Sequence, residues 1–566
     1  MSRSSSPVDR PRQKDTAVPA PRLRRPLLLL TAAVASAGLA ASGVVAPAVA
    51  DTRPGAGTAV TVSTDALPTV QINGVVWDQA VVGNTVYAAG RFSQARPAGA
   101  KKGADETRVH NMLAYDITTG QLIPSFNPDF NSEVRSIAVH GGKVYAVGNF
   151  TAVNGVKHTR IAAVDATTGN NEKFSGSLNS LAYSVAVSGS RVYTGGQFTS
   201  ASGKKRTRLA AFSASTGSLL GWNPTANRAV QDVVVSPSGS SVVVAGHFST
   251  INGHRALGSA RLNDTTGKKN LSWAVNRTVE NNGPDAAVYS LSGDDDYVYM
   301  SGYSYHPKTV QKRLEGVVSV SWSGKVHWIE DCHGDTYATS SVGSVVYTAS
   351  HAHDCVPIGG FKQTKPIRYN YALAFSRATT HKLGTQPKKQ YTSYKGKPAP
   401  SLLNWYPSFK AGTYTGLNQA VWAVTGDSRY VVYGGEFTQV NGNAQQGLVR
   451  FAVPSIAPNQ DGPRLSGDDL EPTLKAASGG KVAVSFKADF DRDNAHLTYH
   501  VTRVADGTSD VVQRDIALAS RYYFDRPTKK YTDTGLVKGV RYAYRITVTD
   551  PFGNQAVGAT AYVTAK

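Results

Sequence analysis

Short apolar runs recur along most of the chain, and clusters of Gly, Asn, Asp, Ser and Thr separate them. In the stretch RYVVYGGEFTQVNGNAQQGLVRF at 429–451, one apolar run ends in a Gly-Gly step and another begins after the Asn441-Gly442 pair. Asn-Gly between apolar runs favours a hairpin turn, because both turn positions need a positive φ. This stretch therefore predicts antiparallel β-strands.

The same phrase recurs upstream with a period of about 50 residues. It reads KVYAVGNFTAVNG at 143–155, RVYTGGQFTSASG at 191–203 and VVVAGHFSTING at 242–253, with a looser copy, VYAAGRFSQA, at 86–95. A repeat of this length that consists of strands is typical of a β-propeller. We place seven repeats, which begin near residues 75, 134, 182, 230, 288, 336 and 421. The sequence predicts an all-β fold with a seven-bladed β-propeller over residues 67–453.

Within a repeat, an innermost strand precedes the phrase, and a third apolar run follows it. A turn such as DITTG or DATTG then leads to a fourth, outer strand. We expect the strand at 67–76 to complete the last blade, because closing the ring removes free sheet edges. Blade five carries a degenerate phrase, and blade six carries an insertion after Cys355.

A second all-β unit is expected at 464–566, after a linker at 454–463 that is rich in Pro, Asn and Asp. Its apolar runs alternate in the manner of half-buried strands. The spacing of Gly539 and Tyr542 before the penultimate strand resembles a tyrosine corner. These features predict an immunoglobulin-like or fibronectin type III-like β-sandwich.

The first 50 residues have the pattern of a signal peptide, with a basic leader, an apolar run at 27–46 and a small-residue cleavage site at 48–50. We expect residues 51–66 to be a flexible lead-in. No other stretch is long and apolar enough to predict a transmembrane segment in the mature chain. The expected location is therefore secreted or extracellular.

The phrase V-Y-x-G-G-x-F-T-x-V-N-G, followed by L-A-A-F-D-A-x-T-G and W-x-P, resembles the delta-60-type β-propeller repeats of exported actinobacterial proteins. Residues 482–554, which include DFDRDNAHLTYHVTR and YRITVTDPFGNQ, resemble the fibronectin-like modules of the same class of proteins. The resemblance implies the architecture and export. It supplies no catalytic motif.

The formal net charge is +21, and the chain beyond residue 50 keeps roughly +16, which favours polyanionic partners such as teichoic acids, acidic polysaccharides or extracellular DNA. The alternative is an ordinary solvated surface. No recognition helix or basic-aromatic motif indicates sequence-specific nucleic-acid binding. In an exported protein, the isolated pair Cys332 and Cys355 is expected to form a disulfide, which would stabilise the fold by about 3 kcal/mol.

The innermost strands of the repeats place one residue of each in register. Five of the seven are aromatic, and a ring of aromatic and polar side chains at the mouth of a propeller channel suits a sugar or another flat ligand. The alternative is that these side chains pack between neighbouring blades. The candidate ligand-binding residues are Trp77, Arg135, Tyr183, Gln231, Tyr289, Tyr337 and Trp422.

Blade six gathers histidines and carboxylates in EDCHGDTY at 330–337 and SHAHDC at 350–355. His351 and His353 would share a strand face, and we place His351 in the slot that Phe fills in other blades. Together with His333 and Asp335 or Asp331, they would form a divalent metal site or the acid and base of a lyase or hydrolase. The alternative is a disulfide-stapled loop with surface histidines.

The predicted sandwich contains a further candidate. Asp489, Asp491 and Asp493 alternate in a loop and resemble the start of a calcium site, although no Gly or Glu completes an EF-hand. The alternative is that they cap turns and strands. No other cofactor is indicated.

Our leading hypothesis is a non-catalytic binding or scaffold protein of the adhesion type, whose propeller binds glycan or protein ligands at the cell exterior. The alternative is an exported polysaccharide-active hydrolase (glycosidase) or lyase that uses the blade-six cluster.

Overall fold

The computed structural model describes residues 59–269, 272–305, 312–508 and 510–566. The predicted signal peptide at 1–50 and residues 51–58 of the predicted lead-in lie outside these ranges. The described residues are mostly in strands and turns, with short 3-10 helices η1 (Ala274–Arg277), η3 (Val356–Ile358) and η4 (Asp468–Leu470). No helix in the described ranges is long and apolar enough to cross a membrane.

Seven antiparallel sheets follow one another along the described residues between 75 and 452, and we number them as blades one to seven. The innermost strands are β2 (Val75–Val82), β7 (Val134–His140), β12 (Ala182–Ser188), β17 (Val230–Val235), β22 (Ala286–Gly293), β26 (Thr336–Val342) and β32 (Val421–Gly426). The middle strands are β3 (Thr85–Arg91), β8 (Lys143–Gly148), β13 (Arg191–Gly196), β18 (Ser241–Gly246), β23 (Tyr297–Ser304), β27 (Val345–Ala352) and β33 (Tyr430–Gly435). The third strands are β6 (Met112–Asp116), β11 (Ile161–Asp165), β16 (Leu209–Ser213), β21 (Ser259–Asn263), β24 (Gly316–Ser321), β28 (Asn370–Ser376) and β36 (Leu448–Ala452).

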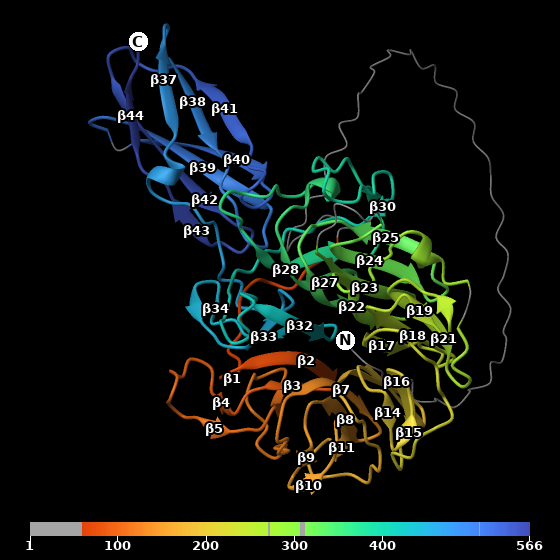
Figure 1. Cartoon of the computed structure of the whole chain (residues 1–566). Coiled ribbons are helices and arrows are strands. Elements are labelled where there is room, and N and C mark those ends of the chain that lie inside the picture. Colours follow the sequence, from red (N-terminus) through yellow and green to blue (C-terminus); the bar gives the residue numbers. More distant parts are fainter. Residues whose placement is uncertain (1–58, 270–271, 306–311, 509) are drawn as a thin grey trace, which may run out of the picture. The chain divides into compact units, whose positions relative to one another are not determined.

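The blades form a closed ring. Neighbouring innermost strands contact one another in chain order, and β32 of the last blade contacts β2 of the first. All seven innermost strands therefore face a common centre (Figure 1).

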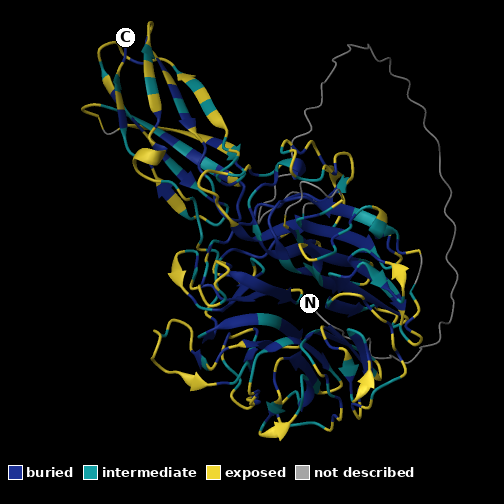
Figure 2. Cartoon of the chain, in the orientation of Figure 1, coloured by how far each residue is buried: buried dark blue, intermediate teal, exposed yellow. Residues whose placement is uncertain are grey.

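The apolar core lies between the blades. One cluster joins Ala80 and Tyr87 of blade one to Val134 and Ile137 of blade two, and all positions of β18 are buried. In the propeller, Figure 2 shows buried blade strands in dark blue and exposed residues gathered in hairpins and loops. Because each blade is covered on both faces, its strands appear in the sequence as continuous apolar runs rather than alternating ones.

Short hairpins extend the blades outward. They are formed by β1 (Gln71–Ile72), β4 (Gln94–Arg96), β5 (Thr107–Arg108), β9 (Ala152–Val153), β10 (Val156–Lys157), β14 (Ser200–Ala201), β15 (Lys204–Lys205), β19 (Thr250–Ile251), β20 (His254–Arg255), β29 (His381–Lys382), β30 (Pro398–Ala399), β31 (Phe409–Lys410), β34 (Gln439–Val440) and β35 (Asn443–Ala444).

The prediction of a fourth strand in every blade was wrong. In the described residues, blade five alone has one, β25 (Val326–Glu330). Blade one has only the bridge between Tyr115 and Leu122 at this place, and blade three only a bridge between Phe212 and Leu219. Pro124 and Pro224 soon follow these bridges, and proline has no backbone N–H with which to continue a ladder.

The segment before the first blade closes the ring. Leu67 N donates to Arg450 O at 2.9 Å and Ser63 N donates to Ala452 O at 2.8 Å, so this segment lies along β36. The closing segment therefore begins before the predicted boundary at 67, and Val75 and Val76 belong to the innermost strand β2 instead. Residues 61–64 are buried rather than forming a flexible lead-in, because they pack along the last blade.

The residues after the propeller form two antiparallel sheets. The first contains β37 (Thr473–Ala477), β38 (Lys481–Lys487) and β41 (Thr528–Asp533), and the second contains β39 (His496–Ala505), β40 (Val511–Ala519), β42 (Arg541–Thr549), β43 (Gln555–Val557) and β44 (Ala561–Thr564). Phe486 of the first sheet and Leu497 of the second share one apolar cluster. Val537 N donates to the Tyr542 hydroxyl at 2.9 Å, as expected for a tyrosine corner.

Candidate functional site

A β-bulge interrupts the innermost strand of every described blade at the same place. In blade one, Val76 pairs with Gly90 and Asp78 pairs with Ala89, so Trp77 has no partner in the ladder. A bulge re-aims the side chain of its extra residue. The residues skipped in this way are Trp77, Arg135, Tyr183, Gln231, Tyr289, Tyr337 and Trp422.

The repeated Gly of the phrase permits this bulge. Gly435 stands opposite Val421, and a Cβ on it would lie 2.0 Å from Ala420 O. At Gly148, a Cβ would lie 2.3 Å from Glu133 O. In six blades a glycine therefore stands where the innermost strand approaches the middle strand, one residue before the bulge, and blade six has Ser350 at this place.

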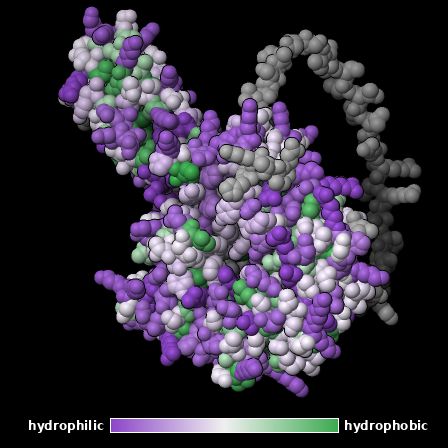
Figure 3. Space-filling view, viewed as in Figure 1, coloured by the Kyte–Doolittle hydropathy of each residue, from purple (hydrophilic) through white to green (hydrophobic). Residues whose placement is uncertain are grey.

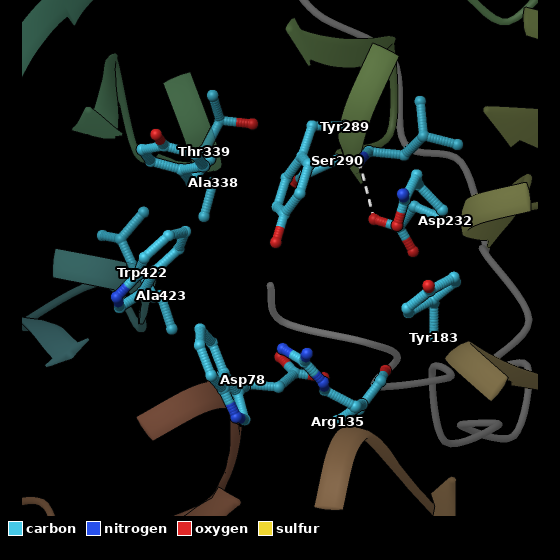
Figure 4. A pocket seen from close by; sticks show the side chains of 16 residues that line it. Asp78, Arg135, Tyr183, Asp232, Tyr289, Ser290, Ala338, Thr339, Trp422 and Ala423 are labelled. Atoms are coloured by element: carbon cyan, nitrogen blue, oxygen red, sulfur yellow. Dashed lines mark hydrogen bonds between the residues drawn. The ribbon is translucent and has the colours of Figure 1, made fainter. Parts of the chain in front are cut away.

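The seven bulged residues line a single cavity of about 100 Å³ at the centre of the ring (Figure 4). These are the seven residues that the sequence predicts as a ligand-binding ring. Their side chains reach the channel because the bulge, and not the regular alternation of the strand, sets their direction.

Four of the five aromatic members form a continuous arc along one side of the cavity. Trp77 packs edge-on against Trp422 with ring centroids 5.1 Å apart. Trp422 lies 4.4 Å from Tyr337, and Tyr337 lies 5.4 Å from Tyr289. The arc presents aromatic surface from blades one, seven, six and five.

The other side of the cavity is polar. Arg135 lies over the Trp77 ring at 4.2 Å, and its Nε is 3.4 Å from Glu133 Oε1. Tyr183 accepts a hydrogen bond from Gln197. Within the described ranges, the buried Trp77 Nε1 has no hydrogen-bond partner. The cavity therefore offers a wall of inclined aromatic rings and a guanidinium.

Sequence analysis missed a second ring of lining residues. They follow the bulged residues directly in six of the blades and are small or acidic: Asp78, Ser136, Asp232, Ser290, Ala338 and Ala423. The recurrence of Asp, Ser or Ala at this position in every repeat is a signal that an alignment of the repeats would have revealed.

The second ring ties neighbouring blades together. Ile137 N of blade two donates to Asp78 Oδ2 of blade one at 2.9 Å. Leu291 N of blade five donates to Asp232 Oδ2 of blade four at 2.7 Å, as the dashed line in Figure 4 shows. These carboxylates are engaged by backbone N–H groups, so the Arg135 guanidinium is the cationic group that the lining offers to a ligand.

The blade-six candidates separate into two pairs. His351 Nε2 lies 3.9 Å from Asp335 Oδ2, and Asp335 Oδ2 also accepts hydrogen bonds from the hydroxyls of Tyr337 at 3.2 Å and Tyr305 at 3.3 Å. This pair borders the cavity, because Tyr337 is one of the residues that line it.

The second pair lies beneath the blade-six insertion. His333 Nε2 is 3.8 Å from Asp331 Oδ1, and both side chains are almost fully buried. The His333 ring stacks on Tyr391 at 3.7 Å. His353 follows the first pair along the chain, and its ring contacts Tyr369 at 6.1 Å. The structure therefore does not bring the predicted His333, Asp335, His351 and His353 into one site.

Burial shifts the pKa values of Asp331, His333 and Asp335. It raises the pKa of Asp331 to about 8, with the Asp354 charge adding to the effect, and lowers the pKa of His333 to about 3. The pKa of His353 is lowered to about 4, mainly by burial. Burial also raises the pKa of Asp335, although the neighbouring His351 opposes the shift.

Glu315 is a titratable residue that sequence analysis missed. Burial raises its pKa to about 8, and Asp335 adds to the shift. Nothing in the repeated phrase identifies it, because it lies between the middle and third strands of blade five.

The predicted disulfide between Cys332 and Cys355 is present. It lies beside the bridge in which His333 N donates to Asp354 O at 3.0 Å. The assignment of His351 to the Phe slot was wrong by one residue. Ser350 pairs with Thr336 as Gly148 pairs with Val134, so Ala352 occupies the Phe slot.

No group of three or more His, Cys, Asp or Glu side chains with the geometry of a metal site occurs in the part of the chain that the structure describes. Asp489 accepts hydrogen bonds from Leu465 N at 3.0 Å and Phe490 N at 2.6 Å. Asp493 accepts one from Thr64 N at 2.7 Å, and Asp491 accepts one from Asp493 N at 3.2 Å. The carboxylates thus cap backbone N–H groups, as the alternative expected, and calcium binding stays a prediction.

Comparison with known proteins shows no family for this chain. No family model and no curated protein matches the chain. The chain is similar to the computationally designed Ika8 protein, with 14% identity over 68% of this chain and 99% of that chain, and a TM-score of 0.37. It is also similar to the β-propeller domain of Myceliophteria thermophila Cps50 (Swd1), with 6% identity over 69% of this chain and 99% of that chain, and a TM-score of 0.38.

Proposed function

We propose that this chain is an exported binding protein whose propeller holds one sugar unit of a glycan in its central cavity. One observation carries the proposal: seven bulged residues from seven blades line a single cavity, five of them with aromatic rings. An aromatic arc suits the apolar face of a sugar ring, while the Arg135 guanidinium suits its oxygen atoms.

The size of the cavity supports partial rather than complete enclosure of the ligand. Pockets that enclose a whole small molecule measure about 300–1,000 Å³, whereas this cavity measures about 100 Å³. A terminal sugar or a protruding unit of a polymer fits this picture better than a free metabolite. The space-filling view agrees with a polar exterior, since its visible face is largely hydrophilic (Figure 3).

Charge favours an acidic glycan. The formal net charge is +21, and a positive surface attracts polyanions. At the cavity, Arg135 is the cationic side chain of the lining, so it can pair with a ligand carboxylate. Export rests on the signal-peptide pattern and on the resemblance to delta-60-type proteins.

The proposal is tested by titrating the purified protein with neutral and acidic polysaccharides and following tryptophan fluorescence and heat of binding. We expect Trp422→Ala to weaken binding at least tenfold, because it removes the centre of the arc. Tyr414→Ala is the matched control, since Tyr414 is a propeller aromatic with 48% exposure outside the cavity lining. Absence of glycan binding, or equal losses in the two variants, would refute the proposal.

A second candidate function is a polysaccharide-active hydrolase or lyase. One specific observation favours it: the Tyr337 hydroxyl that reaches Asp335 belongs to a ring that lines the cavity. Asp335 and His351 would supply a proton acceptor and donor next to a bound sugar. Release of new reducing ends or unsaturated sugars by the wild type, lost in His351→Ala, would establish this activity. Binding without turnover would exclude it for the polysaccharides tested.

A further inference from the structure

We propose, on the basis of the function proposed above, that the cavity is the inner end of an aromatic track that binds several consecutive units of a glycan chain. The aromatic track consists of two branches that leave the cavity. One runs through Tyr337, His351 and Tyr369 in blade six, and the other runs through Tyr289, Tyr303 and Tyr305 in blade five.

Ring contacts make each branch continuous. Tyr337 lies 5.9 Å from His351, and His351 lies 5.4 Å from Tyr369. Tyr289 lies 6.2 Å from Tyr303, and Tyr303 lies 5.4 Å from Tyr305. These spacings are within the range of direct aromatic contact. Both branches begin at residues that line the cavity, and Tyr289 and Tyr337 also contact each other.

The repeat explains the position of the track. In blades three and seven, the residue that follows the Gly of the repeated phrase contacts the bulged residue of the same blade. Gln197 contacts Tyr183, and Glu436 contacts Trp422. In blade five, Tyr303 follows the Gly. In blade six, Ser350 replaces the Gly, and His351 follows it. These two blades therefore continue the aromatic surface outward, where blades three and seven place a polar side chain.

Exposure increases along the track. Trp422 in the cavity is 5% exposed, whereas Tyr369 is 38% exposed and Tyr305 is 57% exposed. Rings that serve only to pack blades together would be covered by their neighbours, as the propeller core is. A row of contacting rings that passes from a cavity to the surface instead provides a series of stacking positions for a chain.

Polar groups accompany the rings. Asp335 accepts hydrogen bonds from both Tyr305 and Tyr337, and His351 Nδ1 lies 3.2 Å from Gln419 Oε1. A sugar presents an apolar face and a rim of hydroxyls, so alternating rings and hydrogen-bonding groups suit it. A protein partner would instead anchor apolar side chains in a dry pocket, which this polar margin does not favour.

The test uses two oligomer ladders, cello-oligosaccharides and oligogalacturonides, each from monomer to hexamer. For wild type, we expect affinity for one ladder to increase with length. In Tyr305→Ala/Tyr369→Ala, hexamer affinity should fall about tenfold, while the shortest binding oligomer should keep its affinity. Both changed side chains are exposed, so the variant should fold. Trp422→Ala should weaken every length, and Tyr414→Ala should weaken none.

The outcomes separate the two proposals. If short oligomers bind through Trp422 but the hexamer binds no more tightly, the track is refuted and the cavity function stands. A length dependence that the double variant leaves unchanged also refutes the track. If neither ladder binds, both proposals fail. If a protein binds at the cavity and no glycan does, a glycan is the wrong ligand class in both proposals.

Discussion

Gly435 and Ala420 approach so closely that a Cβ on Gly435 would lie 2.0 Å from the carbonyl oxygen of Ala420. This contact joins the middle strand of blade seven to the start of its innermost strand, one residue before the bulge that directs Trp422 into the cavity. The glycine of the repeated phrase thus connects the sequence repeat to the geometry of the candidate site.

Gly435→Ala is therefore expected to destabilise the protein by about 2–4 kcal/mol, because the backbone must shift to admit the methyl group. The displaced bulge should also weaken glycan binding at the cavity. Denaturant unfolding measures the first effect and fluorescence titration the second. Gly221→Ala is the matched control, since a Cβ there meets no atom within 4 Å. Equal stabilities of the two variants would contradict the role assigned to Gly435.

The buried pair of Asp331 and His333 should give the stability of the protein a maximum at mildly acidic pH. The pKa of Asp331 rises from about 3.9 in the unfolded chain to about 8 in the fold. The folded protein then holds more protons, so this contribution to stability decreases as pH rises through 8. The pKa of His333 falls to about 3, so its contribution is retained above about 6.5 and is lost as pH falls.

Asp331→Asn tests this linkage. The amide resembles the protonated acid, so the variant should unfold at a melting temperature a few degrees above that of wild type at pH 8 and near that of wild type at pH 4.5. Scanning calorimetry from pH 4 to pH 9 measures the difference. Asp427→Asn, at a partly exposed carboxylate in a turn, is the control for the substitution itself. A constant offset between Asp331→Asn and wild type would show that Asp331 does not change protonation on folding.

The disulfide should contribute measurably to stability. Cys332 and Cys355 are separated by 23 positions, and a closed loop of this length stabilises the fold by about 3 kcal/mol. The variant Cys332→Ala/Cys355→Ala should unfold at correspondingly lower denaturant concentration. A reductant present throughout unfolding should lower the midpoint of the wild type and leave that of the variant unchanged. If the reductant has no effect on wild type, the bond does not contribute as expected.

Arg450 should be important for ring closure. Its guanidinium donates to Pro68 O at 2.6 Å and to Ile117 O, and its Nε donates to Thr69 Oγ1 at 3.3 Å. Arg450→Met leaves three acceptors without a charged donor, so we expect a loss of about 2–4 kcal/mol. Limited proteolysis should then cleave the segment before residue 75 sooner than in wild type. Arg429→Met, at a half-exposed side chain, should change neither measurement.

Much of the candidate site could be predicted because the propeller repeats itself. Aligning the repeats placed seven residues in one register, and the structure brings all seven to one cavity. The alignment could not show why they point inward, because the bulge arises from the close approach of two backbones. Nor could it show the track, since the contact between His351 and Tyr369 joins a repeat to an insertion.

The positions of the blade-six residues were harder to predict from the sequence, because the repeat is interrupted there. Spacing suggested that four residues would converge, but the ladder turns Asp335 toward the cavity and leaves Asp331 and His333 beneath the insertion. Ser350 in place of Gly also obscured the register, so His351 was assigned one position away from its true place.

The sequence by itself determined the three inner strands of the blades, the turns, the repeat and the residues of the ring, because these depend on local apolar patterning and on conformational preferences of Gly and Asn. Only the tertiary structure decided which side chains share a cavity, which carboxylates lose their water and how the ring closes. Those properties depend on contacts between residues far apart in the chain, such as Leu67 with Arg450, and no local pattern specifies them.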